Sequence, residues 1–573
     1  MAPRKKLPAA MKPMTSTASK AAAIRKGSAS KGFPAPTTTT TAAILPTRAH
    51  SQSYHYPLLL SHRTTCNALL QWFEGVEETR SMPWRKNWID PKDFKGREEE
   101  LGSELATRAY EVWVSEVMLQ QTRVSTVIPY FNNWIAKWPT VQDLADANHD
   151  DVLFVWKGLG YYSRATRLHE GAKAMTTKSI GSSCPIPSNV EDLQQFPGIG
   201  RYTAGAISSI AFGEAAPVLD GNVARVLSRQ LGLYMDVKDK KASDILWDVA
   251  DQLIKHVSES LETGTSSIPG QWNQALMELG STVCTPRPRC EDCPIQKTCR
   301  VYSEGQALSD KRQAPTVLPD IEDGCSLCGL VDMEDFMTAS DEGGTEEAPR
   351  AAKKRKTSTK QANTISQYFA VGTPKPKAEP HHDKEVANGL SVEETRKRKT
   401  LESTAKSRSI SAYCSLFPKK VAKKKAAEED CVVCIVELRL SDGSSKWLIE
   451  QRPAKGLLAS LWQFPQSTLS ASQATPSHRK TSAQQYIASI DIGGIDMSKA
   501  EYVAALPPLV HVFTHLKLTM HAYQFRITAN EAEGFALICN GTPARKWVDT
   551  ESMGDETLST GMHKCWELVS KDV

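Results

Sequence analysis

The spacing of hydrophobic residues changes character along the chain. From about Tyr54 to Tyr302, apolar residues recur at helical intervals, most clearly over 110–119, 204–212 and 223–231. From Cys431 onward, short runs rich in β-branched and aromatic residues predict strands over 431–440, 447–450, 510–513 and 517–527. We therefore expect a multidomain protein with an all-α part followed by a separate domain that contains a β-sheet.

Two stretches lack either periodicity. Residues 1–54 are rich in Ala, Thr, Lys and Pro, and no Asp or Glu precedes Glu74. Residues 304–428 are dominated by charged residues, Ser and Thr. Such segments bury too little apolar surface to fold. The expected organisation is a disordered basic arm (1–54), a helical domain (55–303), a disordered linker (304–428) and a C-terminal domain (429–573).

Composition narrows the class of protein. With 573 residues the chain has room for about two to four domains, and its apolar runs fall short of the roughly 18 residues of a membrane span. We expect a soluble monomer. The net charge is +5, and basic runs at 353–356, 396–399 and 423–425 suit nuclear import or DNA contact. The basic arm resembles a transit peptide or a nucleic-acid-binding tail. From the basic runs and the arm together, we expect a nuclear location and a mitochondrial one as well.

A glycine-rich hairpin opens the helix predicted over 204–212. It reads Phe-Pro-Gly-Ile-Gly-Arg-Tyr-Thr-Ala-Gly over 196–205, and Asp220 follows on the next segment. Gly198 and Gly200 would let the main chain approach a ligand, and the free amides of the helix start suit a phosphate. The alternative is an ordinary helix–turn–helix corner with a capping Asp.

Glu116 interrupts an apolar helix. If it is buried, its pKa rises toward the range of a general acid; the alternative is an exposed helix-face Glu. Together with an ionised Asp220 it would supply the two carboxylates that glycoside chemistry uses. Trp84 with Arg85, and Tyr161 with Arg164, place aromatic rings beside arginines, as an enzyme that extrudes a base from DNA requires. Each such pair could also be core packing.

Cys284, Cys290, Cys293 and Cys299 lie within sixteen residues in the pattern C-x5-C-x2-C-x5-C. Four thiolates at this spacing could bind either zinc or an iron–sulfur cluster. The spacing leaves both open. Four basic residues flank the quartet and suggest that the loop faces DNA phosphate: Arg287, Arg289, Lys297 and Arg300.

Taken together, these motifs resemble the MutY-type adenine DNA glycosylases. The matches are Pro83–Arg85, Trp113–Thr122, Gly158–Ala165, Phe196–Gly205, Leu219–Val223 and the cysteine quartet. The resemblance implies a helix–hairpin–helix glycosylase fold with a 4Fe–4S cluster on Cys284, Cys290, Cys293 and Cys299. It also implies an enzyme that removes adenine mispaired with 8-oxoguanine or guanine in duplex DNA.

The resemblance further implies roles for single residues. Glu116 would protonate N7 of the flipped adenine, Asp220 would stabilise the oxocarbenium ion or trap it covalently before water attacks, and Asn222 would orient Asp220. The remaining implied contacts are the adenine pocket (Tyr202, Trp84, Arg85), a wedge in the duplex (Gln121, Tyr161) and a phosphate site (Gly198, Gly200).

The C-terminal domain resembles the Nudix-like module of the same family, through residues 456–465 and 511–515. In the family this module checks the 8-oxoguanine, which implies that role for Phe513, Thr514 and His515. A Nudix hydrolase needs a cluster of glutamates to hold magnesium. Because no Glu lies between Gln451 and Ala500, we expect no pyrophosphohydrolase activity.

Other features match the family in part. Mammalian members bind a zinc ion in the linker, and His55, Cys325 and Cys328 match its ligands, but Leu318 stands where another cysteine is expected. Residues 365–369 resemble a peptide that binds the sliding clamp, although Ala362 replaces its Gln. The first gap of the cysteine quartet is one residue shorter than usual, and an insertion at about 89–108 has no assigned function.

Two other functions are possible. A related glycosylase–lyase for oxidised pyrimidines needs a lysine amine, and those relatives carry it where Tyr202 stands, so strand cleavage is expected to be weak or absent. A non-catalytic scaffold that binds DNA damage is disfavoured because Glu116 and Asp220 are both present in their motifs.

Overall fold

The computed structural model describes residues 50–178, 184–259, 265–310, 325–328, 404–421, 426–453, 456–470, 475–492, 495–513, 515–529, 538–539 and 543–570. Several sequence predictions lie outside these residues. They concern most of the basic arm, the clamp-like peptide at 365–369, the three basic runs, Leu318 and Thr514.

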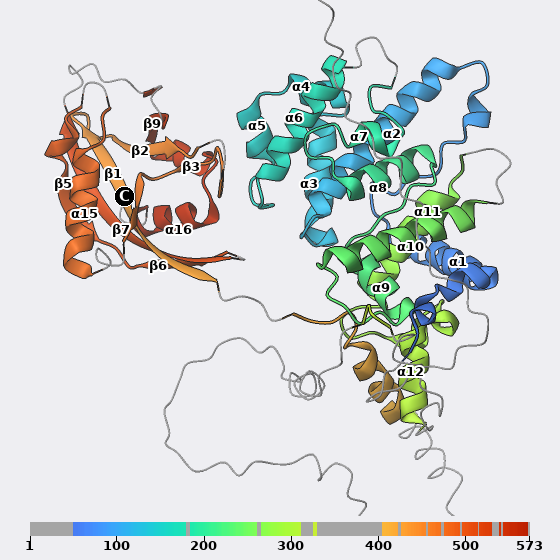
Figure 1. The fold of residues 1–573 in the computed structure, drawn as a ribbon. Coiled ribbons are helices and arrows are strands. Elements are labelled where there is room, and N and C mark those ends of the chain that lie inside the picture. The colour runs from blue at the N-terminus through green and yellow to red at the C-terminus, as the bar shows by residue number, and fades with distance from the viewer. Residues whose placement is uncertain are drawn as a thin grey trace, which may run out of the picture.

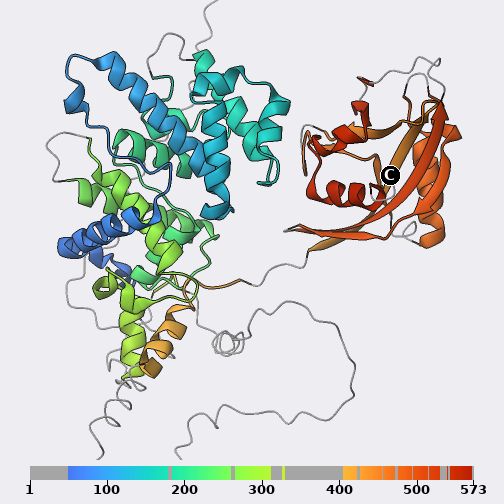
Figure 2. The ribbon, with the colours of Figure 1, turned by 180° about the vertical axis from the view of Figure 1, so that it is seen from behind.

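The N-terminal part is helical (Figures 1 and 2). Its α-helices are α1 (Arg63–Arg80), α2 (Glu98–Leu119), α3 (Val124–Lys137), α4 (Val141–Asp146), α5 (His149–Val155), α6 (Ser163–Lys178), α7 (Val190–Leu193), α8 (Arg201–Phe212), α9 (Gly221–Leu231), α10 (Lys240–Ser258), α11 (Ile268–Thr282) and α12 (Arg300–Ser309). Short 3-10 helices are η1 (Gln52–His55), η2 (Leu58–Ser61), η3 (Pro91–Phe94), η4 (Cys290–Asp292) and η5 (Gln296–Thr298).

Helix α2 is the central element of this part. Every residue from Arg108 to Met118 is buried, which explains why most residues of this stretch are apolar. Helix α8 packs against α2, and one core joins them to α1, α3, α6, α9 and α11. The insertion at about 89–108 forms η3 and the first half of α2. Burial of α2 on all sides therefore places Glu116 inside the protein.

The predicted boundary of the linker at 304 is wrong. Helix α12 continues to Ser309, and residues 404–414 form a further helix beside α12 (Figures 1 and 2, ochre beside yellow-green). Ile410, Tyr413 and Phe417 are buried there in one cluster with Val301 of α12. The many charged residues of the segment made this helix unrecognisable in the sequence. Its apolar side is buried because it packs against α12.

The C-terminal part is a mixed β-sheet. Its strands are β1 (Ala427–Leu440), β2 (Ser445–Gln451), β3 (Trp462–Gln463), β4 (Gln466–Leu469), β5 (Glu501–Ala505), β6 (Leu509–Val512), β7 (Leu516–Ala529), β8 (Ile538–Cys539) and β9 (Arg545–Asp549). The main order is β5-β7-β1-β2-β9-β8. Strands β1 and β7 run parallel, whereas β2 and β4 are antiparallel to β1.

Strand β1 is buried on both faces because its side chains alternate between two cores. Val432, Cys434 and Val436 pack on the side of helix α15 (Pro476–Ala488). Val433 and Ile435 pack on the side of helix α16 (Thr560–Val569). The described residues of this part also form the 3-10 helices η9 (Met497–Lys499) and η10 (Glu551–Gly554).

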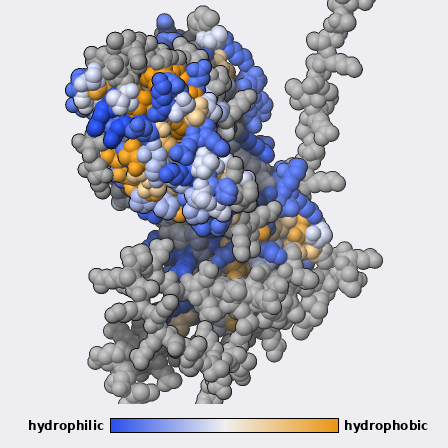
Figure 3. Space-filling model, turned by 90° about the vertical axis from the view of Figure 1, so that its left-hand side faces the viewer, coloured by the Kyte–Doolittle hydropathy of each residue, from blue (hydrophilic) through white to orange (hydrophobic). Residues whose placement is uncertain are grey.

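The surface of the sheet domain carries hydrophobic side chains among hydrophilic ones (Figure 3). Its exposed large apolar residues include Val503, Val510 and Val512. Among the described residues, none of the helices combines the length and the apolar character that a membrane crossing needs.

Candidate active site

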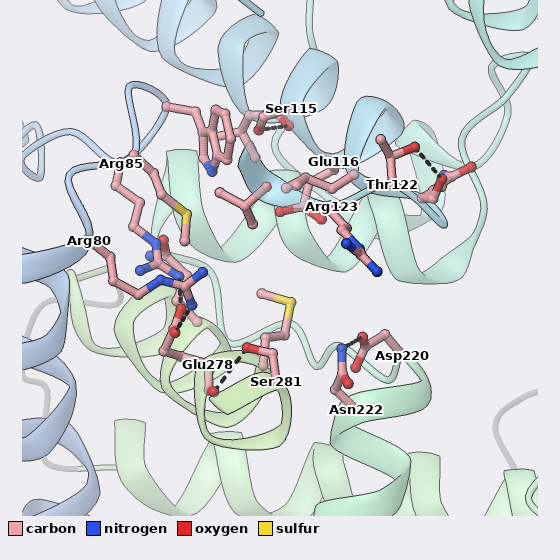
Figure 4. Close-up of a pocket in the computed structure, with 18 of the residues that line it drawn as sticks. Arg80, Arg85, Ser115, Glu116, Thr122, Arg123, Asp220, Asn222, Glu278 and Ser281 are labelled. Carbon is pink, nitrogen blue, oxygen red and sulfur yellow. Dashed lines mark hydrogen bonds and ion pairs between the residues drawn. The ribbon is translucent and has the colours of Figure 1, made fainter. Parts of the chain in front are cut away.

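A cavity of about 1190 Å³ lies among α2, α8, α9 and α11. Many of the residues predicted for the site line it, and they are Trp84, Arg85, Glu116, Gln121, Tyr202, Asp220 and Asn222. Figure 4 shows Glu116, which belongs to α2, on one side of the cavity and Asp220, at the start of α9, on another. The structure thus brings together two carboxylates that are far apart in the sequence.

Glu116 is 7% exposed and is hydrogen-bonded to a tyrosine. The Tyr202 hydroxyl donates to Glu116 Oε2 at 2.6 Å and also lies 3.0 Å from Met277 Sδ. Burial raises the pKa of Glu116 to about 7, although the hydrogen bond from Tyr202 acts in the opposite direction. A substantial share of this carboxyl group is therefore protonated near neutral pH.

Asp220 is the N-cap of α9 and accepts two hydrogen bonds. They come from the Val223 N–H, at 2.7 Å, and from Asn222 Nδ2, at 2.8 Å. Burial raises the pKa of Asp220, whereas these donors lower it. Since the donors favour the charged form, Asp220 is the better of the two acids for staying ionised.

Asn222 is held in turn by Arg225. The Arg225 guanidinium donates to Asn222 Oδ1 at 2.7 Å and to the backbone oxygens of Gly280 and Cys284, each at 2.8 Å. A Cβ on Gly280 would lie 2.7 Å from the Cβ of Asn222, so only glycine allows α11 this close to α9. Arg225 thus joins the Cys284 carbonyl of the cysteine loop to Asn222, and Asn222 in turn donates to Asp220.

Arg80 and Glu278 were missed by the sequence analysis. Glu278 is 2% exposed, lines the cavity and accepts from both Arg80 and Arg85, the latter at 2.8 Å (Figure 4). Arg85 Nη1 is buried and has no hydrogen-bond partner among the described residues. A buried carboxylate between two arginines was not apparent from the sequence, because Glu278 follows an ordinary helical pattern.

Gln121 and Tyr161 occupy two neighbouring turns that one arginine joins. Both residues have positive φ, 58° and 49°, and the Tyr161 ring is 52% exposed. Arg164 is buried and donates to the backbone oxygens of Val117, Met118 and Gln120 in one turn and of Leu159 and Gly160 in the other. Gln121 lines the cavity, whereas Tyr161 lies outside its lining.

Gly198 and Gly200 of the hairpin lie outside the cavity lining and are exposed. Gly198 has a φ of +81°, and a Cβ there would lie 2.9 Å from the Cβ of Arg167. Gly200 has a φ of −90° and is the N-cap of α8, without a side chain over the first amides. Gly198 therefore adopts the left-handed conformation that favours glycine, whereas Gly200 has an extended backbone.

The residues predicted to check the opposite base lie between β6 and β7. Phe513 packs edge-on against His511, with ring centroids 4.5 Å apart, and lines a small cavity of the sheet domain. His515 is exposed and its backbone oxygen accepts from the Ala427 N–H at 3.0 Å.

The cysteine quartet surrounds one pocket with Arg229 at its side. Arg229 donates to Cys284 Sγ at 3.2 Å. Of the four flanking basic residues, Arg287, Arg289 and Lys297 are exposed. Arg300 is 6% exposed and lies 4.6 Å from the centre of the Tyr54 ring, so its predicted contact with DNA phosphate is wrong.

A second group of ligand atoms forms at the edge of the helical domain. Side chains of His50, His55, Cys325 and Cys328 offer atoms that all lie within 4.8 Å of one another. His55 Nε2 lies 3.0 Å from His50 Nε2, 3.3 Å from Cys325 Sγ and 3.4 Å from Cys328 Sγ. His55 Nδ1 is paired with the Leu231 carbonyl at 2.9 Å. His50 was not predicted as a ligand because it lies in the basic arm.

The chain is similar to known DNA-repair proteins. A family model described as the HhH-GPD superfamily of base excision DNA repair proteins matches residues 114–252, and one described as the NUDIX domain matches 437–568. An adenine DNA glycosylase from Rattus norvegicus is 34% identical over 511 residues, which cover 87% of this chain and 77% of the relative. The chain belongs to the adenine DNA glycosylase family.

Two further members of the family are similar over most of their length. The adenine DNA glycosylase of Homo sapiens is 34% identical and covers 87% of this chain and 73% of its own. That of Schizosaccharomyces pombe is 30% identical, with 83% and 84% covered. The predicted resemblance and fold class, a helix–hairpin–helix glycosylase with a Nudix-like domain, are confirmed.

Proposed function

We propose that this enzyme removes adenine from duplex DNA in which the adenine faces 8-oxoguanine or guanine. The observation that carries the proposal is the buried Glu116–Tyr202 pair, which lines the same cavity as the capped Asp220. Burial raises the pKa of Glu116 to about 7, so much of this carboxyl group is protonated near neutral pH, whereas the hydrogen-bond donors around Asp220 favour its charged form. Cleavage of an N-glycosidic bond uses one carboxyl group as the proton donor and a second, ionised one to stabilise the positive charge on the sugar.

The two acids act on opposite ends of the breaking bond. Glu116 donates its proton to N7 of adenine, so that the base leaves as a neutral molecule when the bond from N9 to C1′ breaks. Asp220 stabilises the positive charge that develops on the sugar. Water then adds at C1′ and loses a proton, which leaves an abasic site and restores Glu116.

The cavity also offers groups that suit a flipped base. The buried Arg85 Nη1 can donate to a purine acceptor, while Trp84 and Tyr202 supply ring surfaces. The exposed Tyr161 ring and Gln121 can occupy the gap that the base leaves in the stack. Phe513 and His515, with Thr514 between them, are proposed to contact the opposite base.

The residues that line the cavity also support hydrolysis without strand cleavage. Lyase chemistry requires an amine that forms a Schiff base with the sugar. The described residues around the cavity include arginines but no lysine, and Tyr202 cannot take that role. We expect the product to stay uncut until alkali or heat is applied, and efficient borohydride trapping of the wild-type protein on DNA would contradict this.

We propose that the cysteine quartet holds a 4Fe–4S cluster. Cys284, Cys290, Cys293 and Cys299 all line one pocket. Four cysteine thiolates around one space are the ligand set of a 4Fe–4S cluster. Bound there, the cluster would stabilise the loop whose Cys284 carbonyl accepts from Arg225.

We also propose that His50, His55, Cys325 and Cys328 bind zinc. The ligand separations fit a tetrahedral ion, and the contact of His55 Nδ1 with the Leu231 carbonyl directs Nε2 toward the other three side chains. His50 then replaces the ligand that Leu318 cannot supply.

Metal analysis tests this zinc site. His50→Ala and the double variant Cys325→Ser/Cys328→Ser should lose zinc while keeping their iron, and exposed His62→Ala is the matched control. Zinc content that is unchanged in both variants would remove the site.

A single-turnover assay tests the main proposal, with duplexes that differ in the base opposite adenine. Glu116→Gln should abolish base release and leave duplex binding nearly intact. The matched control is Glu111→Gln, which changes another buried carboxylate of α2 outside the cavity lining. Survival of base release in Glu116→Gln would show that another group is the acid.

A further inference from the structure

A fifth cysteine lies in the pocket of the cysteine quartet. Cys414 is 1% exposed, lines the same pocket as the quartet and belongs to a buried cluster against which Cys290 packs. It belongs to the helix at 404–414, which is separated from the quartet by the long linker. The family resemblance assigned no role to this residue.

Specific contacts hold this segment on the helical domain. Ser411 Oγ donates to the Pro288 carbonyl at 2.6 Å, inside the cysteine loop. The Phe417 carbonyl accepts from Arg229 Nε at 3.0 Å, and Arg229 is the residue that also contacts Cys284 Sγ. The segment is therefore attached to the loop and to the helix that face each other across the pocket.

A buried carboxylate anchors the other side of the segment. Glu304 of α12 is fully buried and accepts from the hydroxyl groups of Tyr413 and Tyr54, the latter at 2.6 Å. Lys406 and Asp310 add an ion pair near the start of the helix. We call residues 404–421 the cap, because they cover the quartet with a buried apolar cluster.

We propose that the cap shields the cluster and that the Cys414 thiol donates a hydrogen bond to the Cys290 sulfur. The inference rests on the proposed 4Fe–4S cluster. Four cysteines already complete its ligand set, and a ligating Cys290 is a thiolate without a proton. The proton of the hydrogen bond must then belong to Cys414, which makes it a positioning residue rather than a ligand.

Hydrogen bonds to cluster sulfurs and the exclusion of solvent both change the reduction potential of an iron–sulfur cluster. A donor to Cys290 disperses negative charge and favours the reduced, more negative form of the cluster. Removing the donor should shift the reduction potential to more negative values. It should also expose a more electron-rich sulfur to oxidants, so that the cluster is lost faster.

The experiment compares Cys414→Val, Cys414→Ser and wild type in the full-length, iron-loaded protein. Valine keeps the apolar volume without a donor, whereas serine keeps a donor. Cys66→Val is the control, because Cys66 is an equally buried thiol in another part of the same domain. The readouts are iron content, the decay of cluster absorbance under air and chelator, and the reduction potential.

We expect Cys414→Val to lose its cluster roughly 10-fold faster than wild type and to have a more negative potential. Cys414→Ser should recover part of both effects, and Cys66→Val should show neither. A Cys414→Val protein with wild-type decay and potential would overturn the role of the thiol. If Cys290→Ala keeps its iron and loses it only when Cys414→Ala is added, Cys414 is a ligand and the inference is wrong.

Failure of the underlying proposal looks different. A wild-type protein that is purified anaerobically with zinc and without iron in the quartet would contradict the cluster itself. Wild-type iron with unaffected Cys414 variants would contradict only the inference about the cap.

Discussion

Glu116 depends on a contact that lies far away in the sequence. Its burial could be anticipated from the apolar residues around it, and burial is the larger influence on its pKa. The opposing hydrogen bond comes from Tyr202, which belongs to α8. Sequence spacing cannot place two helices against each other, so the resemblance predicted a pocket residue but not its contact with the acid.

This contact predicts a pH dependence. A general acid works in its protonated form, so base release should be fastest below pH about 7 and fall as the pH rises through the pKa of Glu116. Tyr202→Phe removes a donor that favours the carboxylate, and the pKa should rise. The alkaline limb of the single-turnover profile should move upward by about one pH unit.

Met277→Leu is the control for Tyr202→Phe, because it removes the other partner of the hydroxyl and keeps the bond to Glu116. A limb that stays in place or moves to lower pH in Tyr202→Phe would contradict the account of Glu116.

Arg225 supplies a second prediction at this scale. Lysine cannot reproduce its simultaneous bonds to Asn222, Gly280 and Cys284. Arg225→Lys should lower the rate of base release roughly 10-fold, because Asp220 loses its orienting partner. Duplex affinity should change little. Exposed Arg201→Lys is the control in a single-turnover assay, and an unchanged rate in Arg225→Lys would show that Asn222 is held by other contacts.

At the scale of elements, the motifs predicted which segments meet but not what joins them. The turns that carry Gln121 and Tyr161 were both identified from the sequence. Their common attachment is the buried Arg164, whose partners are backbone oxygens that any sequence could present. Every residue type has a backbone carbonyl oxygen, so the sequence does not show which of these oxygens Arg164 binds. Only the structure reveals this connection.

Replacing Arg164 should disturb both turns at once. Arg164→Met leaves several buried carbonyl groups without a donor, at a cost of about 3 kcal/mol. We expect a lower free energy of unfolding and weaker binding to mispaired duplexes. Arg167→Met, an exposed position on the same helix, is the control. Equal stability and duplex affinity in the two variants would contradict the role given to Arg164.

The cap and His50 show why other parts could not be predicted. Ile410, Tyr413 and Phe417 do have helical spacing, but lysines, serines and arginines around them dilute the signal. His50 lies in a segment without periodicity. It can be recognised as a metal ligand only in the structure, where His55 and two cysteines from beyond α12 lie next to it. In both cases the partner lies too far along the chain for local patterns to reveal.

At the scale of the whole molecule, the sheet domain has its own cores. The two clusters on either side of β1 contain only residues from 431 to 569. A domain with a separate core can fold independently. The boundary that follows from the structure lies between the cap, which ends at residue 421, and β1, which begins at Ala427.

This boundary leads to a test of how the activity is divided. A fragment of residues 1–421 keeps the cavity, both proposed metal groups and the cap, so it should retain its iron and remove adenine. It lacks Phe513, Thr514 and His515, and we expect it to discriminate less between 8-oxoguanine and guanine opposite adenine. The measurement is the ratio of single-turnover rates on the two duplexes, compared with the full chain.

A fragment of residues 1–403 is the matched comparison, because it lacks the cap as well as the sheet domain. It should show the same reduced ratio on the DNA that it can still process, but lose its cluster faster than 1–421. An unchanged ratio in 1–421 would mean that the helical domain reads the opposite base by itself. The two truncations therefore separate recognition by the sheet domain from protection by the cap, although both segments follow the same linker.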